Sequence, residues 1–455
     1  MTRVPCPQTA FLFSWLVVAF AGCATPASKQ LERSDVGAGL QEGGHAGVRP
    51  EGAPATAQLP PGVSVDDGLD ETEAAAIALW NNAGFQENLA KLGLARADLA
   101  QAGMLANPTL SMLFPVGPKQ LEFTATLPLE ALWLRPKRVA IATVEAGRVG
   151  QGLVQSGLDL VRDVKVALAD LALAAELATI AGQTLRIREQ ITDIAATRVR
   201  LGDASQLDLT AARAELERAR EEADRFRREN AIGRERMSLL LGWPVRDPNL
   251  TLPAPALLTA PLPPLAALEA KALAARPDLR ASELALEAAG RKCGLADAEV
   301  FTLSGMIDAN AEGREGFEFG PGLAAVLPIF HQNQPARLRA QAELERAAWN
   351  YAGTRQRIVA EVREARMKAE QAAAALAAYE AQVMPPFAEV ERMSRRAYEL
   401  GDVSPLVVRE NSRQLLLVQV RRAELRAALR RAAAELERGL GMRLETFLRQ
   451  NPNPP

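Results

Sequence analysis

Most of the chain places apolar residues at helical spacing, and the same order of segments occurs twice. Apolar positions recur every three or four residues over 70–106, 136–200 and 206–242, and again over 265–299, 335–400 and 405–448. As one helix, residues 136–200 would be on the order of 95 Å long, at about 1.5 Å per residue. Helices of this length exceed those of ordinary globular domains, so the pattern predicts long, mutually packed helices.

In four short stretches the spacing of apolar residues changes from about 3.6 residues, as in a helix, to 2 residues, as in a strand. Apolar and polar residues alternate over 109–114 and 121–127 in the first half, and over 301–310 and 317–327 in the second half. Turn residues separate the members of each pair, as in 115–118. The pattern therefore predicts two β-hairpins, each with one apolar and one polar face.

A short motif marks the end of one long helix in each half. The pattern Leu-Gly-Asp-x-Ser-x-Leu occupies residues 201–207 and 400–406, an offset of 199 residues. Glycine allows the left-handed conformation that ends a helix, and Ser205 or Ser404 can cap the next helix. One copy would be explained by an ordinary surface turn. Two copies in register predict a tandem duplication of helical hairpins, each with a defined tip.

These patterns predict a mainly α fold with a small β part. The domain boundaries that we expect are a signal peptide (1–22), a lipidated flexible tether (23–69), a first repeat (70–242), an equatorial linker (243–264), a second repeat (265–445) and a tail (446–455).

The N-terminus has the features of a bacterial secretory signal. Residues 11–19 form an apolar core that is too short to span a bilayer. Phe20-Ala21-Gly22-Cys23 resembles a lipobox, so Cys23 is the predicted lipid (palmitate) attachment site, and Ala24 favours the outer membrane. The stretch 19–21 also fits an ordinary signal-peptidase site. No later stretch has about 18 unbroken apolar residues, so no transmembrane helix is expected.

Composition and charge exclude several functional classes. The net charge is −2, so the chain lacks the excess of positive charge that is typical of nucleic-acid-binding proteins. Only Cys293 lies in the body of the chain and the two histidines are far apart, so we expect no disulfide framework, metal site or cofactor. No nucleophile and base occur together, so no enzyme is expected.

Four strands are too few to form a closed barrel by themselves. The smallest useful barrel has about eight strands, and open strand edges are not tolerated in lipid. Three copies of the chain would supply twelve strands with apolar residues facing lipid and polar residues facing a lumen. The alternative is two soluble hairpins packed on helices.

Several motifs give residues 70–445 a resemblance to a known family. They are Asn107-Pro108-Thr109-Leu110, Arg276-Pro277-Asp278-Leu279-Arg280, Leu327-Pro328-Ile329-Phe330 and the two tips. In this order, and doubled, they resemble the outer membrane efflux proteins (TolC family). His331-Gln332-Asn333-Gln334 resembles the heavy-metal efflux branch of that family.

The resemblance implies a homotrimeric outer-membrane channel with a twelve-stranded barrel and a helical tunnel through the periplasm. It would be the passive duct of a tripartite efflux system, docked on a periplasmic adaptor (membrane fusion) protein that links it to an inner-membrane pump. The competing hypothesis is a periplasmic coiled-coil adaptor or scaffold lipoprotein. Such a protein would share the lipid and the hairpins but would not need four amphipathic strands.

The resemblance also assigns roles to residues of the tips. The expected adaptor-docking residues are Leu201, Gly202, Ser205, Leu400, Gly401 and Ser404. Family members often narrow the closed tunnel with acidic residues just after the second tip. Here Val407 departs from that pattern, whereas its first-half equivalent, Asp208, keeps it. The candidate gate residues are Glu410 and Asp208. Alternatively, Glu410 is a solvated carboxylate paired with Arg409 or Arg413.

Overall fold

A computed structural model describes residues 31–54, 56–65, 68–114, 116, 121–202, 204–244, 262–311, 317–400 and 402–450. The signal peptide, Cys23, Gly401 and most of the predicted linker lie outside the described residues. The chain divides into two compact units. A sheet unit contains Leu92–Ala146 and Glu287–Leu344, and a helical unit contains Arg33–Lys91, Gly147–Leu286 and Glu345–Pro455.

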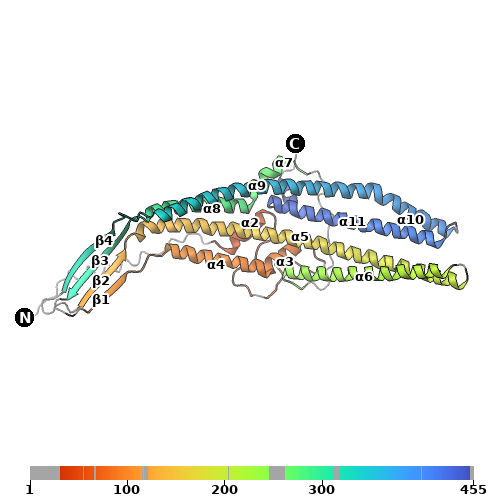
Figure 1. The fold of residues 1–455 in the computed structure, drawn as a ribbon, viewed down its shortest axis with the longest axis horizontal. Coiled ribbons are helices and arrows are strands. Elements are labelled where there is room, and N and C mark those ends of the chain that lie inside the picture. The colour runs from red at the N-terminus through yellow and green to blue at the C-terminus, as the bar shows by residue number, and fades with distance from the viewer. Residues whose placement is uncertain are drawn as a thin grey trace, which may run out of the picture. The chain divides into compact units, whose positions relative to one another are not determined.

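The two predicted hairpins form one antiparallel sheet in the order β1-β2-β3-β4 (Figure 1). Its strands are β1 (Thr109–Leu113), β2 (Leu121–Pro128), β3 (Thr302–Ala311) and β4 (Phe317–Val326). The central β2–β3 pair joins the two repeats, with Thr124 opposite Asp308. Within the described part of the chain, β1 and β4 each have one edge without a partner strand.

The strand register separates the two faces of the sheet. Glu122, Asn310 and Glu318 lie opposite one another across β2, β3 and β4. One row further, the Thr124 hydroxyl donates to an Asp308 carboxylate oxygen at 2.9 Å. The other face carries the apolar residues Leu110, Met112, Phe123, Ile307, Phe319 and Leu323. Phe319 and Leu323 are 70% and 73% exposed, so this face needs an apolar environment outside the chain.

Four helices have one end in the sheet unit. They are α4 (Ala83–Gly103), α5 (Ala131–Arg200), α8 (Pro277–Ala298) and α9 (Gln334–Ala378). The long helix α5 begins five residues before Pro136, the predicted start, and takes the proline into its second turn. Trp133 at its beginning stacks on Phe301, with ring centroids 6.4 Å apart.

The helical unit confirms the long helices but divides three predicted ones and interrupts a fourth, 335–400, with a π-helical turn. Its further elements are α2 (Arg33–Glu42), α3 (Glu71–Asn81), α6 (Gln206–Leu241), α7 (Leu265–Ala275), the π-helical turn η3 (Tyr379–Val383), α10 (Met384–Glu399), α11 (Pro405–Leu440) and α12 (Leu444–Gln450). The predicted helix 70–106 breaks at Asn82, whose side chain accepts from the Phe85 N–H at 2.9 Å and so caps α4.

Two other breaks follow from proline and glycine. The helix predicted over 265–299 breaks at Arg276, because the residue before Pro277 is disfavoured in the α conformation. The helix predicted over 405–448 ends at Gly441, which has a φ of 74°. Helices α9 and α11 share a buried core that includes Ile358, Val362, Leu429 and Leu436.

The Arg-Pro-Asp motif lies at the centre of a partly buried ionic network. The Arg276 side chain is 0% exposed and forms two hydrogen bonds with Asp278, at 3.0 and 2.6 Å. It also donates to Glu361 at 2.6 Å. Arg438 bridges the same Glu361 to Asp159 of the first repeat. The Arg-Pro-Asp motif thus has a structural role, because its ionic network connects the two repeats.

The prediction of a flexible tether over residues 23–69 is wrong where the structure describes α2. Val36 and Leu40 are buried. Leu40 packs so closely on Gly157 that a Cβ there would be 2.9 Å from its methyl group. After α2, the Gly43 carbonyl accepts from the Arg443 N–H at 3.0 Å. Val36, Gly37 and Leu40 form its buried face, which is too short for periodicity to reveal.

The burial of His45, at the end of this packed segment, predicts that folding is sensitive to mild acid. Burial, followed by the positive charge of Lys165, lowers the pKa of His45 from 6.5 to about 4. Between these values the unfolded chain binds a proton that the folded chain does not, so stability falls as the pH falls. We expect lowering the pH from 7 to 5 to cost the wild type about 2 kcal/mol more than His45→Gln. Thermal unfolding of both proteins at the two pH values measures this, and parallel losses would contradict it.

Candidate functional site at the helical tips

The first tip has the predicted glycine and serine geometry. Gly202 has a φ of 75°, which ends α5. Ser205 is the N-cap of α6, and its hydroxyl oxygen accepts from the Asp208 N–H at 3.2 Å. In return, an Asp208 carboxylate oxygen accepts from the Ser205 N–H at 3.0 Å and from its hydroxyl at 2.8 Å. This reciprocal capping box fixes the turn.

The second tip has the same outline with different chemistry. Ser404 is the N-cap of α11, but its side chain makes no capping hydrogen bond, so the predicted cap is wrong here. The position that holds Asp208 in the first tip is Val407 in the second, which cannot complete a capping box. Pro405 instead begins the helix with a preset φ.

Each tip exposes two leucines at equivalent positions of the repeat. Leu201 and Leu207 flank the first tip, Leu400 and Leu406 flank the second, and all four are exposed. Exposed leucines that recur in register at two turns form a surface suited to an apolar partner.

The two candidate gate carboxylates have different surroundings. Glu410 is held by Arg413 at 2.5 Å and accepts from the Gln414 amide at 3.0 Å. The hydrogen bond from Arg413 lowers the pKa of Glu410. Hydrogen bonds from Ser205 lower the pKa of Asp208. Both groups are therefore ionised near neutral pH, but Asp208 is engaged in capping its own helix.

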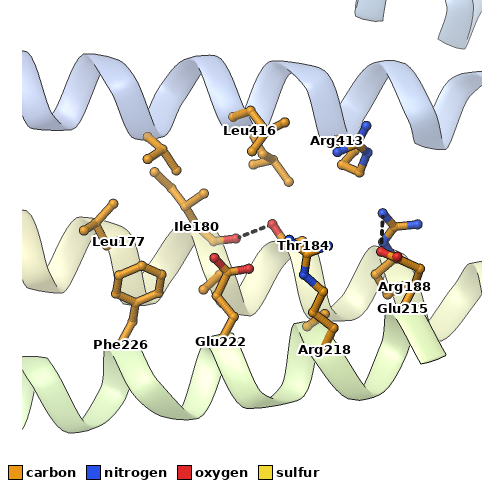
Figure 2. Close-up of a pocket in the computed structure, with 14 residues that line it drawn as sticks. Leu177, Ile180, Thr184, Arg188, Glu215, Arg218, Glu222, Phe226, Arg413 and Leu416 are labelled. Atoms are coloured by element: carbon orange, nitrogen blue, oxygen red, sulfur yellow. Dashed lines mark hydrogen bonds and ion pairs between the residues drawn. The ribbon is translucent and has the colours of Figure 1, made fainter. Parts of the chain in front are cut away.

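Further along the hairpins, α5, α6 and α11 enclose a cavity of about 170 Å³ (Figure 2). Apolar residues that line it include Ile180, Phe226 and Leu416. An ion pair between Arg188 and Glu215, at 3.3 Å, lies beside it. A second cavity of about 580 Å³ lies between α5 and the α10–α11 pair. The first and second hairpins are thus incompletely packed along this seam. The sequence does not reveal ion pairs of this kind, because their partners lie on different helices.

The described residues contain no group of three or more His, Cys, Asp or Glu side chains that could hold a metal ion. Within the same residues, no helix combines the length and apolar character needed to cross a membrane.

Comparisons with known proteins give a family match and several structural matches. Residues 268–442 match the family model described as "Outer membrane efflux protein". The search of curated proteins returned no match. The crystal structure of CusC aligns with a TM-score of 0.68 and 21% identity, over 87% of this chain and 98% of that chain.

Two further solved structures align over a similar extent. A membrane protein from Pseudomonas aeruginosa has a TM-score of 0.69 and 21% identity, over 86% of this chain and 98% of that chain. The open state of the Neisseria gonorrhoeae MtrE outer membrane channel has a TM-score of 0.65 and 18% identity, over 87% and 96%. At these identities the structural matches establish the fold, and the family match covers most of the second repeat.

Proposed function

We propose that this chain is a member of the outer membrane efflux protein family and that it is the outer-membrane channel of a tripartite efflux system. One observation carries the proposal: among the described residues, a four-stranded sheet has an exposed apolar face and two edges without a partner strand, and its strands lie directly before the long helix of each repeat. A scaffold lipoprotein or periplasmic adaptor would need the hairpins but not this sheet.

The unpaired edges support a homotrimer. If the β4 edge of one copy pairs with the β1 edge of the next, three copies form a closed barrel of twelve strands. The face with Phe319 and Leu323 would then contact lipid, and the face with Glu122, Asp308 and Glu318 would line the lumen. Closure also satisfies the edge N–H and C=O groups, which lipid cannot do.

The partners that we propose are a periplasmic adaptor protein at the tips and an inner-membrane pump that supplies the energy. The channel itself would be a passive duct that extends from the outer membrane into the periplasm. Lipid attachment at Cys23, outside the described residues, stays a prediction from the sequence, as does the resemblance of 331–334 to the heavy-metal branch.

Cysteines at the tips test the docking proposal. In a Cys293→Ala background, we expect Leu201→Cys and Leu400→Cys to form crosslinks to the co-expressed adaptor, because both leucines are exposed at the tips. Arg228→Cys, exposed on α6 far from the tip in sequence, is the control and should not crosslink. Crosslinks of equal yield at all three positions would indicate random collision, and none at the tips would rule out docking there.

We propose Glu410 as the gate charge. Three copies of a carboxylate at a constriction favour cations over anions, so Glu410→Gln should lower the cation preference of the reconstituted channel about twofold or more. The matched control is Glu389→Gln, which removes another exposed carboxylate that pairs with an arginine three residues on. Ion selectivity in planar bilayers is the measurement. If the two variants behave alike, Glu410 is an ordinary surface carboxylate.

The role of Asp208 differs in our proposal. Its carboxylate caps α6, so removing it would loosen the first tip in addition to removing a charge. We therefore propose that Asp208 contributes to the gate mainly by holding the first tip in shape.

A further inference from the structure

The helix that leads to the second tip contains one π-helical turn at a proline pair. In η3 the Met384 N–H donates to the Tyr379 carbonyl, five residues back instead of four. Pro385 and Pro386 follow directly and have no N–H. In a regular α-helix their rings would clash with the carbonyls four residues earlier. The wider turn avoids these clashes and absorbs about one extra residue.

This extra residue changes which side of α10 faces outward. Met367 follows Trp349 by 18 residues, about five full turns at about 3.6 residues per turn, so both lie on one line along α9. Met393 follows Met367 by 26 residues, which in an uninterrupted α-helix is about 7.2 turns, or roughly 80° off that line. With one residue absorbed in η3 the separation becomes about 6.9 turns, and Met393 returns to the line.

The line is exposed and carries apolar side chains. Trp349 and Met367 are 72% and 69% exposed, and Val390 and Met393 are 49% and 60% exposed. Between the first two, the same line passes Gly353, Gln356 and Ala360, all exposed. Charged residues also lie beside the line, and they pair within the chain: Arg363 with Glu269, Glu364 with Lys368 and Glu389 with Arg392. We call the line from Trp349 through Met367, Val390 and Met393 the α9–α10 ridge.

The opposite side of α10, which faces α11, is polar. Ser394 is buried, and the Glu391 side chain accepts from the Ser412 hydroxyl at 3.1 Å. Without η3, a rotation of about 100° would place Val390 and Met393 where Glu391 and Ser394 now lie. Two contacts hold η3 on α11: the Tyr379 hydroxyl donates to the Val418 carbonyl at 3.1 Å, and Glu380 pairs with Arg426 at 2.8 Å. The fold thus keeps apolar side chains outward that a regular helix would turn inward.

We propose that the α9–α10 ridge is the surface on which a second copy of this chain packs a long helix, and that η3 is the device that aligns the ridge. The inference rests on the proposed trimer. From Trp349 to Met393 the ridge is on the order of 65 Å long at about 1.5 Å per residue. A neighbouring copy can supply helices of that reach, such as α5 with 70 residues. A partner that docks on the tips would cover only the α10 end.

Labelling of single cysteines tests the ridge. In the Cys293→Ala full-length protein, we expect Met393→Cys in the detergent-extracted trimer to react with a maleimide at least tenfold more slowly than in the dissociated chain. Arg392→Cys, one residue away on the exposed surface, should react at similar rates in both states. Equal protection at both positions, or protection at neither, would overturn the ridge as an interface. Protection of Met393→Cys only when adaptor is added would overturn the choice of a second copy.

The proline pair gives the second test. Pro385→Ala/Pro386→Ala removes the reason for η3, so α10 should return to the α-helical phase with its helicity retained by circular dichroism. We expect Met393→Cys to become reactive in this variant and the trimer to dissociate at a lower detergent concentration. An unchanged trimer with Met393→Cys still protected would overturn the role of η3. If the wild-type chain forms no trimer, the proposed function fails, whereas a trimer with an unprotected ridge contradicts only this inference.

Discussion

Replacing Arg276 by methionine should destabilise the helical unit by about 3–5 kcal/mol. The arginine side chain is fully buried, and its removal leaves Asp278 and Glu361 without the cation that both of them contact. Because the network continues through Arg438 to Asp159, the loss should loosen the connection between the two repeats. Thermal or denaturant unfolding in detergent measures the change.

The matched control for this prediction is Arg280→Met in the same motif. Arg280 is 58% exposed, and among the described residues it pairs with Glu283, one turn away. Surface pairs of this kind contribute about 0–1 kcal/mol, so this variant should unfold close to the wild type. Similar stabilities for the two variants would mean that the buried network does not hold the repeats together.

Arginine in place of Phe319 should prevent the chain from assembling in the outer membrane. Phe319 lies on the exposed apolar face of β4, and a lipid-facing arginine near the middle of a bilayer costs about 2–4 kcal/mol. Three copies carry this cost together in one barrel. The measurement is the amount of heat-dissociable trimer in isolated outer membranes.

The neighbouring residue supplies the control. Glu318 lies on the opposite face of the same strand, opposite Asn310, so Glu318→Arg would place its charge toward the lumen. This variant should assemble at nearly the wild-type level. If Phe319→Arg assembles as well as Glu318→Arg, the apolar face does not contact lipid.

Much of the fold could be predicted because it is periodic. The long helices and the four strands follow from spacing alone, and the doubled Leu-Gly-Asp motif placed both tips. The boundaries were less accurate where a single residue decides them. Asn82 ends one helix and caps the next with its own side chain, and Gly441 ends α11 in the left-handed conformation.

The remaining features depend on partners far away in the sequence. Residues 33–42 have almost no apolar stripe, yet they pack as a helix because Gly157 lets Leu40 approach α5 closely. The burial of Arg276 depends on Glu361, which is 85 residues away. The capping difference between the tips could have been predicted, since Val407 replaces the residue type that completes the box at Asp208. The proline pair at 385–386 is visible in the sequence, but its consequence for the phase of α10 needed the structure.

The most direct test of the account is the assembly state and conductance of the full-length protein, extracted from outer membranes in mild detergent. Native mass spectrometry should give a trimer, and the same material should form ion-conducting pores in planar bilayers. A monomer recovered from the soluble or peripheral fraction, without pores, would contradict the channel and favour the scaffold lipoprotein.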